Sequence, residues 1–148
     1  MRAITRLAWV VLLCGAAATV GLAETGAPPE KLAAFAQGLA LADVAGFVQT
    51  VGTLRRSGRL PAWYVTKDDA RAHGWQGGGL CAVWPGHLIG GDRFYESGTR
   101  LPHRPGRSYH EADLDSDCLS RGPKRLIFSN DGLIFVTTDH YTTLTPVP

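Results

Sequence analysis

The chain has 148 residues, which leaves room for one domain and little more. Its 15 lysines and arginines are nearly balanced by 13 aspartates and glutamates, so the formal net charge is only +2. This balance excludes binding to a polyanion through overall charge, and any such attraction must come from locally placed cations.

The first 23 residues have the organisation of a secretory signal peptide. Arg2 and Arg6 come before an apolar run, and the small residues that follow predict cleavage after Ala23. The alternative is a retained membrane anchor, but the run is shorter than the roughly 20 residues that cross a bilayer. We therefore expect a protein secreted to the exterior or periplasm without an anchor, in which residues 24–29 are a flexible lead-in and residues 30–148 the folded domain.

Cleavage after residue 23 would change the charge balance to 13 against 13 and leave two cysteines, Cys81 and Cys118. An even pair in an exported protein predicts a disulfide, and two buried thiols are the alternative. The bridge would close a loop of about 37 residues and contribute roughly 3 to 4 kcal/mol. A domain of about 125 residues can bury a core without it, so the disulfide would add to an already stable fold.

The first part of the predicted domain is helical. From Leu32 to Leu54, apolar residues recur at steps of three and four, which predicts one amphipathic helix or two in succession. Ser57 and Gly58 end this pattern, and Pro61 follows them.

A further helix is predicted to begin at Thr66, an N-cap residue followed by two carboxylates in the first turn. Gly74 is its expected stop. After three consecutive glycines, residues 80–84 are expected to form one short turn of helix.

From His87 onward the pattern changes to strands. Tight-turn residues Asn130, Asp131 and Gly132 separate the third and fourth candidates. Helices followed by strands predict an α+β domain in which the N-terminal helices pack on one face of a five-stranded antiparallel sheet. The candidate strands are residues 87–94, 107–114, 125–129, 133–138 and 141–145.

Four segments of the chain carry a family pattern: LPAWYVTKDDARAHGW (60–75), HLIGGDRF (87–94), LPHRPGRSYHEADL (101–114) and RLIFSNDGLIFVTTDHYTT (125–143). In this order they resemble the barnase-like microbial ribonucleases, a family of secreted, guanine-preferring endoribonucleases. They cover nearly the whole mature chain, and their order makes a chance match improbable. The resemblance implies N-terminal helices against a five-stranded antiparallel sheet, in agreement with the periodicity.

The resemblance implies two catalytic residues, Glu111 as general base and His140 as general acid. Metal-independent cleavage of RNA needs a base for the 2′-hydroxyl proton, an acid for the departing 5′-oxygen, and cations for the charge on the phosphate. The product is a 2′,3′-cyclic phosphate that water later opens to a 3′-phosphate. A carboxyl of intrinsic pKa about 4.3 and an imidazole of about 6.5 have the required protonation states near pH 5 to 6.

The resemblance also implies a set of phosphate-binding cations, Lys67, Arg121 and Arg125. Arginine forks bind phosphate oxygens in pairs, and lysine supplies a compact charge. Tyr141 matches a residue that flanks the nucleotide, and Asp113 would hold the arginines in position. Three converging cations would let a near-neutral protein bind RNA.

The base-recognition loop departs from the family pattern. Its candidate residues are Phe94, Tyr95, Glu96 and Ser97. Where the family usually has an Arg-Glu pair that reads guanine, this chain has Ser97 followed by Gly98. Glu96 could substitute if the loop shifts its register, and backbone N–H groups could bind a guanine carbonyl. Guanine preference is therefore a hypothesis here.

Other charged residues have structural interpretations. Arg107 and Asp131 are expected to pair, and Cys118 falls in the loop just before Arg121 when placed on the family fold. His110 should point away from the face that carries Glu111, because neighbouring strand residues alternate. The extra length at residues 51–59 is expected to extend the helix or the loop that follows it. A solvated helix end is the preferred interpretation, and a basic patch formed by Arg55, Arg56 and Arg59 is the alternative. The histidines lack ligand-like spacing, so no metal or other cofactor is implied.

Two classes of function follow. The preferred one is an endoribonuclease acting on single-stranded RNA, because both the acid and the base are present. The alternative is a non-catalytic module on the same fold that binds RNA or an inhibitor. We expect a monomer, and the resemblance makes an acidic inhibitor protein of the barstar type a candidate partner.

Overall fold

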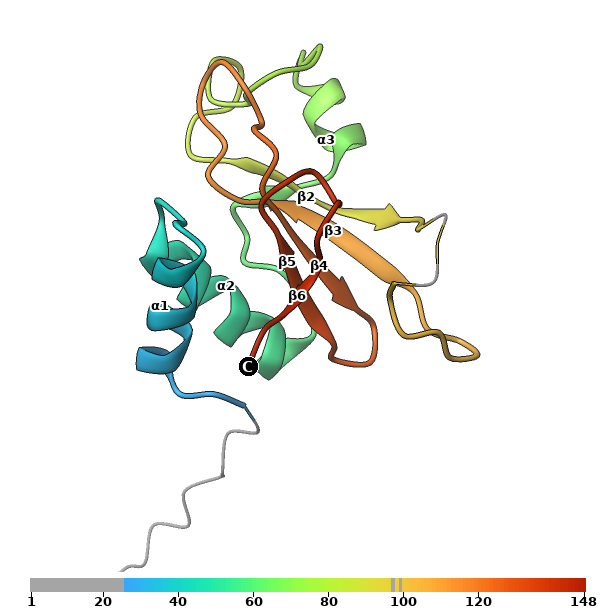
Figure 1. The fold of residues 1–148 in the computed structure, drawn as a ribbon. Coiled ribbons are helices and arrows are strands. Elements are labelled where there is room, and N and C mark those ends of the chain that lie inside the picture. Colours follow the sequence, from blue (N-terminus) through green and yellow to red (C-terminus); the bar gives the residue numbers. More distant parts are fainter. Residues whose placement is uncertain (1–25, 97, 99) are drawn as a thin grey trace, which may run out of the picture.

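The computed structural model describes residues 26–96, 98 and 100–148. The predicted signal peptide and Ser97 lie outside the described residues. The described part contains helices at its N-terminal end followed by a sheet, with a third helix between the first two strands (Figure 1). Their bounds are α1 Pro29–Gly38, α2 Val44–Ser57, β1 Tyr64–Val65, α3 Lys67–Ala72, β2 Leu88–Phe94, β3 Tyr109–Asp113, β4 Arg125–Ser129, β5 Ile134–Thr137 and β6 Thr145–Pro146.

The amphipathic pattern of the N-terminal region forms two helices. α1 begins at Pro29, one residue before the predicted domain boundary, because proline is well suited to the first helical position. At the start of α2, Asp43 accepts a hydrogen bond from the Gly46 amide at 2.8 Å. α2 ends where predicted, since Gly58 has the left-handed φ of 68° that terminates a helix. No helix in the described ranges is long and apolar enough to cross a membrane.

α3 begins at the predicted N-cap. Thr66 and Asp69 form a reciprocal capping box, each side chain accepting from the other residue's amide. The amide of Lys67 donates to Asp92 at 3.0 Å, which fixes the start of α3 against β2. Residues 80–84 form a hydrogen-bonded turn, in which the Trp84 amide donates to the Leu80 carbonyl, and not a helix.

The sheet in the described residues has six strands, in the order β1-β2-β3-β4-β5-β6, where five were predicted. The additional strand, β1, pairs in parallel with β2, and the other neighbours are antiparallel. A parallel pair needs a crossover connection, and the segment containing α3 provides it. The turn at residues 130–132 joins β4 to β5 as predicted, with Gly132 at a φ of 97°.

The last predicted strand was largely wrong. The chain enters β6 only at Thr145, whereas residues 141–144 belong to a loop. His140 and Tyr141 have φ angles of 56° and 71°, which are incompatible with an extended strand. This loop has a conformation that local residue preferences do not favour, so tertiary contacts must hold it.

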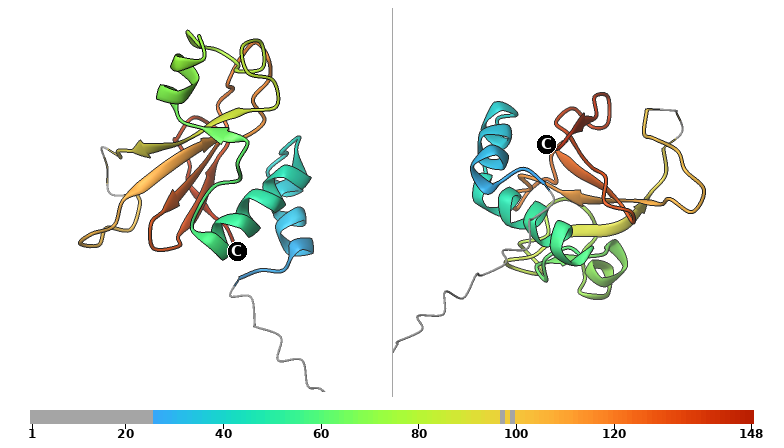
Figure 2. Two further views of the ribbon diagram at one scale, coloured as in Figure 1. Left: turned by 180° about the vertical axis from the view of Figure 1, so that it is seen from behind. Right: turned by 90° about the horizontal axis from the view of Figure 1, so that it is seen from below.

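The sheet presents two different faces. One packs against α1 and α2, which lie together on that side (Figure 2). It is formed by alternate strand residues, Ala112, Leu126, Phe128, Ile134 and Val136. The register places Asp113, Arg125 and Thr137 side by side on the opposite face, and Glu111 lies two residues from Asp113 on the same face. Polar side chains therefore gather on the side away from the main core.

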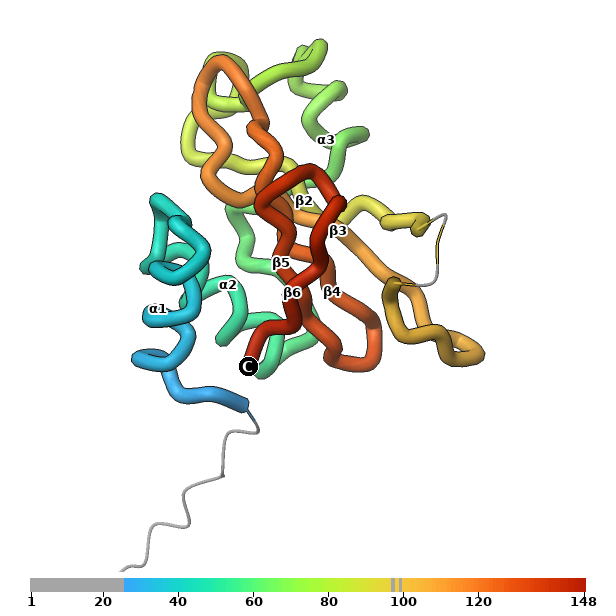
Figure 3. Tube along the Cα trace, viewed as in Figure 1, coloured from blue at the N-terminus to red at the C-terminus, as the bar shows by residue number. Residues whose placement is uncertain are grey.

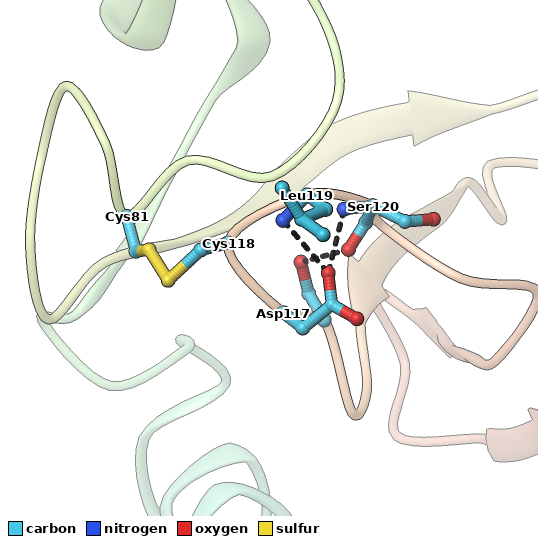
Figure 4. Close-up of a disulfide and its surroundings, with 6 residues drawn as sticks. Cys81, Asp117, Cys118, Leu119 and Ser120 are labelled. Atoms are coloured by element: carbon cyan, nitrogen blue, oxygen red, sulfur yellow. Dashed lines mark hydrogen bonds between the residues drawn. A yellow bond between two sulfur atoms is a disulfide. The ribbon is translucent and has the colours of Figure 1, made fainter.

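The predicted disulfide between Cys81 and Cys118 is confirmed. It joins the connection between α3 and β2 to the loop between β3 and β4, and these two segments lie side by side (Figure 3). Beside it, the Asp117 carboxylate accepts from the amides of Leu119 and Ser120 at 2.8 and 2.6 Å (Figure 4). The cross-linked loop is therefore restrained by its own turn as well as by the disulfide.

Candidate active site

Glu111 lies at the centre of the polar face. Its side chain is 9% exposed, and its Oε1 is 2.6 Å from Nζ of Lys67. Its Oε2 accepts a hydrogen bond from the Tyr141 hydroxyl at 2.5 Å. The three residues come from β3, from the start of α3 and from the loop after β5. Tertiary structure thus brings together residues that are 44 and 30 positions apart.

The surroundings of Glu111 favour its ionised form. Burial alone would raise the pKa of this carboxyl, but hydrogen bonds from Lys67 and Tyr141 and the charges of Lys67 and Arg121 hold it below its ordinary value. Conversely, burial and the nearby Glu111 carboxylate raise the pKa of the Tyr141 hydroxyl to about 12. The pair is therefore a carboxylate and a neutral phenol that donates to it.

Asp113 organises two arginines beside this pair. It is fully buried and accepts from Nε and Nη2 of Arg121, both at 2.7 Å. Arg125 Nε lies 3.1 Å from the same carboxylate. Burial alone would lower the pKa of Arg121, but its ion pair with Asp113 raises it above the ordinary value. The predicted contacts of Asp113 with both arginines are confirmed, and the cluster retains a net positive charge.

The two arginines differ in accessibility. The Arg125 side chain is 4% exposed, and its Nη1 donates to three backbone carbonyls in the loop before β4. The Arg121 side chain is 20% exposed, and its guanidinium lies 6.0 Å from the Trp75 ring. Arg121 is therefore the more accessible of the two, whereas Arg125 supports the loop as well as contributing charge.

His140 is exposed and lies next to the pair formed by Glu111 and Tyr141. Its ring centroid is 5.0 Å from that of Tyr141, and its amide donates to the Pro123 carbonyl at 3.2 Å. Thr137 accepts from the Tyr141 amide at 2.9 Å and donates to Asp139. These contacts hold the left-handed backbone at residues 140 and 141 and present the imidazole to solvent.

The candidate base-recognition loop meets the site through Phe94, whose ring stacks on Tyr141 with centroids 5.1 Å apart. Tyr95 is 78% exposed, and the Arg93 guanidinium lies 5.3 Å from its ring centroid. Phe94, Tyr95 and Glu96 are among the residues that line a cavity of about 500 Å³. Ser97 lies outside the described residues.

The structure brings most of the predicted site residues together. Lys67, Glu111 and Tyr141 are in direct contact, and Arg121 and Arg125 share Asp113. His140 is linked to them through the Tyr141 ring.

Two predictions for residues outside this cluster are confirmed. His110 lies away from the cluster, with its ring stacked on Phe128 of the core face at a centroid separation of 5.7 Å. Arg107 pairs with Asp131 through three hydrogen bonds of 2.7 to 3.0 Å.

Several supporting residues were not predicted from the sequence. Thr137 and Asp139 hold the His140 loop, and Arg100 donates to the carbonyls of Tyr141 and Thr142. Thr137 and Asp139 could have been inferred from the sequence, because both belong to the polar segment TTDHY that also contains His140. Arg100 gave no signal, because its partners are 41 and 42 positions away.

The arrangement has the parts needed for proton transfer at a phosphodiester. It contains an ionised carboxylate, an accessible imidazole and three cations around one polar face. A carboxylate can accept a proton, an imidazolium can donate one, and the cations can stabilise anionic phosphate oxygens.

Comparisons with known proteins agree with this chemistry. A family model described as ribonuclease matches residues 49–148. A ribonuclease of Bacillus intermedius and one of Bacillus pumilus are each 46% identical over 96 residues, which is 64% of this chain and 59% of each relative. A ribonuclease of Heyndrickxia coagulans is 47% identical over 92 residues, which is 61% of this chain and 84% of that relative. The alignment thus spans about six tenths of the length of the two Bacillus proteins.

Proposed function

Because the chain belongs to the ribonuclease family, we propose that it is an endoribonuclease that cleaves single-stranded RNA without a metal ion. Glu111 is the proposed general base and His140 the proposed general acid. The observation that carries this proposal is the Glu111 carboxylate, held ionised by Lys67 and Tyr141 beside an exposed imidazole. The side chains supply the base, the acid and the cations that the reaction needs.

The proposed reaction begins at the ribose 2′-hydroxyl. Glu111 takes its proton, and the 2′-oxygen forms a bond to phosphorus as the bond from phosphorus to the 5′-oxygen breaks. His140 donates a proton to the departing 5′-oxygen, which leaves a 2′,3′-cyclic phosphate. Water then opens the cyclic phosphate to a 3′-phosphate, with Glu111 and His140 exchanging their acid and base roles.

Lys67, Arg121 and Arg125 are the proposed stabilisers of the phosphate. Their support is the cluster around Asp113 and Glu111, where three cations meet two buried carboxylates. This local excess of positive charge lets a near-neutral protein attract a polyanion.

Two groups are proposed to contact the bases. Tyr141 flanks the nucleotide, supported by the contacts of its ring with the rings of Phe94 and His140. The loop that begins at Phe94 selects the base, and guanine is the preferred base by resemblance to the family. Comparing cleavage after each of the four bases in defined oligonucleotides tests this preference, and equal rates would refute it.

Export and partners complete the proposal. We propose that residues 1–23 are removed as a signal peptide and that the protein acts as a monomer outside the cytoplasm. The disulfide between Cys81 and Cys118 supports an oxidising compartment. An inhibitor of the barstar type is a candidate partner, because an acidic surface would complement the cations of the site.

The proposal is tested by incubating the protein with RNA in the presence of EDTA. We expect products with 2′,3′-cyclic phosphate ends, and we expect Glu111→Gln or His140→Gln to lower the rate by at least about a hundredfold. Arg71→Gln is a suitable control, because Arg71 pairs with Asp68 on the exposed side of α3 and changes the net charge away from the site. Dependence on added metal, or full activity in Glu111→Gln, would reject the mechanism, and RNA binding without cleavage would favour a non-catalytic module.

A further inference from the structure

Glu96 is a buried carboxylate in a loop with no other acidic residue. Its side chain is 7% exposed, and it is the only aspartate or glutamate in the sequence between Phe94 and Tyr109. Its Oε1 accepts from Arg100 Nε and its Oε2 from the Leu101 amide, both at 2.9 Å. A carboxylate has about four acceptor positions, and one that reads a base must keep some of them accessible to the N–H groups of that base. In Glu96 each oxygen already binds a donor of the same loop, and burial of the side chain shields the positions that remain.

Arg100 extends this contact to the loop between β5 and β6, which contains His140 and Tyr141 and is called the catalytic loop below. While its Nε binds Glu96, its Nη1 donates to the carbonyls of Tyr141 and Thr142, the latter at 3.0 Å. The planar guanidinium has donors pointing in several directions, so one arginine can hold both partners in a defined relative position. Arg100 thus joins the loop after β2 to the segment that contains Tyr141 and His140.

That segment needs such support. His140 and Tyr141 both have positive φ, a backbone conformation that residues other than glycine adopt only where the surrounding structure holds them in it. The same segment places the Tyr141 hydroxyl on Glu111. A carbonyl of this loop bound by Arg100 cannot swing away without breaking a charge-assisted hydrogen bond.

We propose that Glu96 and Arg100 form a positioning clamp for the catalytic loop, and that Glu96 does not read the base. The functional consequence rests on the proposed ribonuclease activity. Base choice then depends on other groups, such as backbone N–H donors and the exposed Tyr95 ring. Loss of the clamp lowers turnover on every substrate alike, because it displaces His140 and the Tyr141 hydroxyl that binds Glu111, and both serve the reaction whichever base is bound.

The test uses four chimeric oligonucleotides that each contain one ribonucleotide, G, A, C or U, in a deoxyribonucleotide background. Values of kcat and KM are measured for Glu96→Gln, Arg100→Gln and the double variant. For Arg100→Gln we expect kcat to fall about tenfold on every substrate, with the order of the bases unchanged. Glu96→Gln, which keeps one acceptor oxygen, has a smaller and equally uniform effect. The double variant should have the same kcat as Arg100→Gln, because both substitutions remove the same contact between Glu96 and Arg100.

Arg100→Lys and Arg71→Gln separate the clamp from simple charge effects. Lysine keeps the charge but cannot bridge Glu96 and two carbonyls, so we expect Arg100→Lys to remain impaired in kcat. Arg71→Gln, which also removes one exposed cation, should retain the parent kcat. Full activity in Arg100→Lys would assign Arg100 to charge attraction and overturn the clamp. A selective loss on one base in Glu96→Gln would show that Glu96 reads that base, and would overturn it as well.

A second measurement does not depend on activity. While the clamp holds the catalytic loop, the Tyr141 amide donates to Thr137 and the Thr143 amide donates to Asp139. Both amides should therefore exchange slowly with solvent deuterium. Arg100→Gln should accelerate their exchange about tenfold, and Arg71→Gln should not. Unchanged exchange would refute the clamp even if no substrate is cleaved, and absence of cleavage by the parent protein would count only against the proposed function.

Discussion

Removal of the disulfide should destabilise the protein strongly but change its activity little. Cys81 and Cys118 are 37 positions apart, and in the chain-entropy model a bridge of that span contributes about 4 kcal/mol to the free energy of unfolding. For a domain of this size, a loss of about 4 kcal/mol lowers Tm by roughly 15 °C. Because Asp113 binds Arg121 independently at 2.7 Å, the site should remain assembled in the folded molecule.

The measurement is equilibrium unfolding in urea of the parent protein and the variant Cys81→Ala/Cys118→Ala. The midpoint should fall, and dithiothreitol should lower the stability of the parent to that of the variant without affecting the variant itself. Assayed well below its Tm, the variant should keep kcat within about threefold. A loss of less than about 1 kcal/mol would refute the entropic reasoning. A tenfold fall in kcat in the folded variant would show that Asp113 alone does not hold Arg121.

Three further predictions concern the site, the cross-linked loop and the β4–β5 turn. Tyr141→Phe should move the acidic limb of the pH–rate profile to higher pH, because Glu111 loses a hydrogen bond that lowers its pKa and so becomes protonated sooner as pH falls. Gly79→Ala should lower the free energy of unfolding, measured in urea, by more than about 2 kcal/mol. The added methyl group would lie 1.9 Å from the Asp117 carbonyl oxygen in the disulfide-linked loop. Gly38→Ala serves as the control, because a methyl group added there has no atom within 4 Å. The hydrogen bond from Arg107 lowers the pKa of Asp131 to about 2. The ionised Asp131 therefore stabilises the folded state at pH values above the pKa that it has in the unfolded chain, and this stabilisation is lost as the pH falls toward 2. Asp131→Asn should remove that part of the acid dependence of unfolding.

Local structure could be predicted well from the sequence where neighbouring residues decide it. The capping box at Thr66, the helix end at Gly58 and the turn before Leu133 depend on contacts within a few positions. The disulfide was predictable because signal cleavage would leave only Cys81 and Cys118 to pair. In each case the physical cause lies in adjacent residues or in simple counting.

Strand assignment failed where pairing overrides local preference. β1 is only two residues long and exists because β2, more than 20 positions later, offers it a parallel partner. The predicted strand from Tyr141 was replaced by a loop with positive φ, since contacts to Thr137 and Pro123 hold the backbone there. The periodicity of apolar residues does not show that β2 would pair with β1, nor that Thr137 and Pro123 would bind the backbone of residues 140 and 141.

The sequence by itself determined the α+β order of elements, the alternation of faces on β3 and β4, and the residue types that suit phosphate chemistry. Resemblance to a family supplied Glu111 and His140, which carry little local signal. Only the tertiary structure decided that Lys67 and Tyr141 both bind the carboxylate of Glu111. These contacts join residues 30 or more positions apart, and their geometry depends on how α3, β3 and the loop after β5 pack together. The same holds for Arg100, whose role arises from carbonyls more than 40 positions away that no local pattern could indicate.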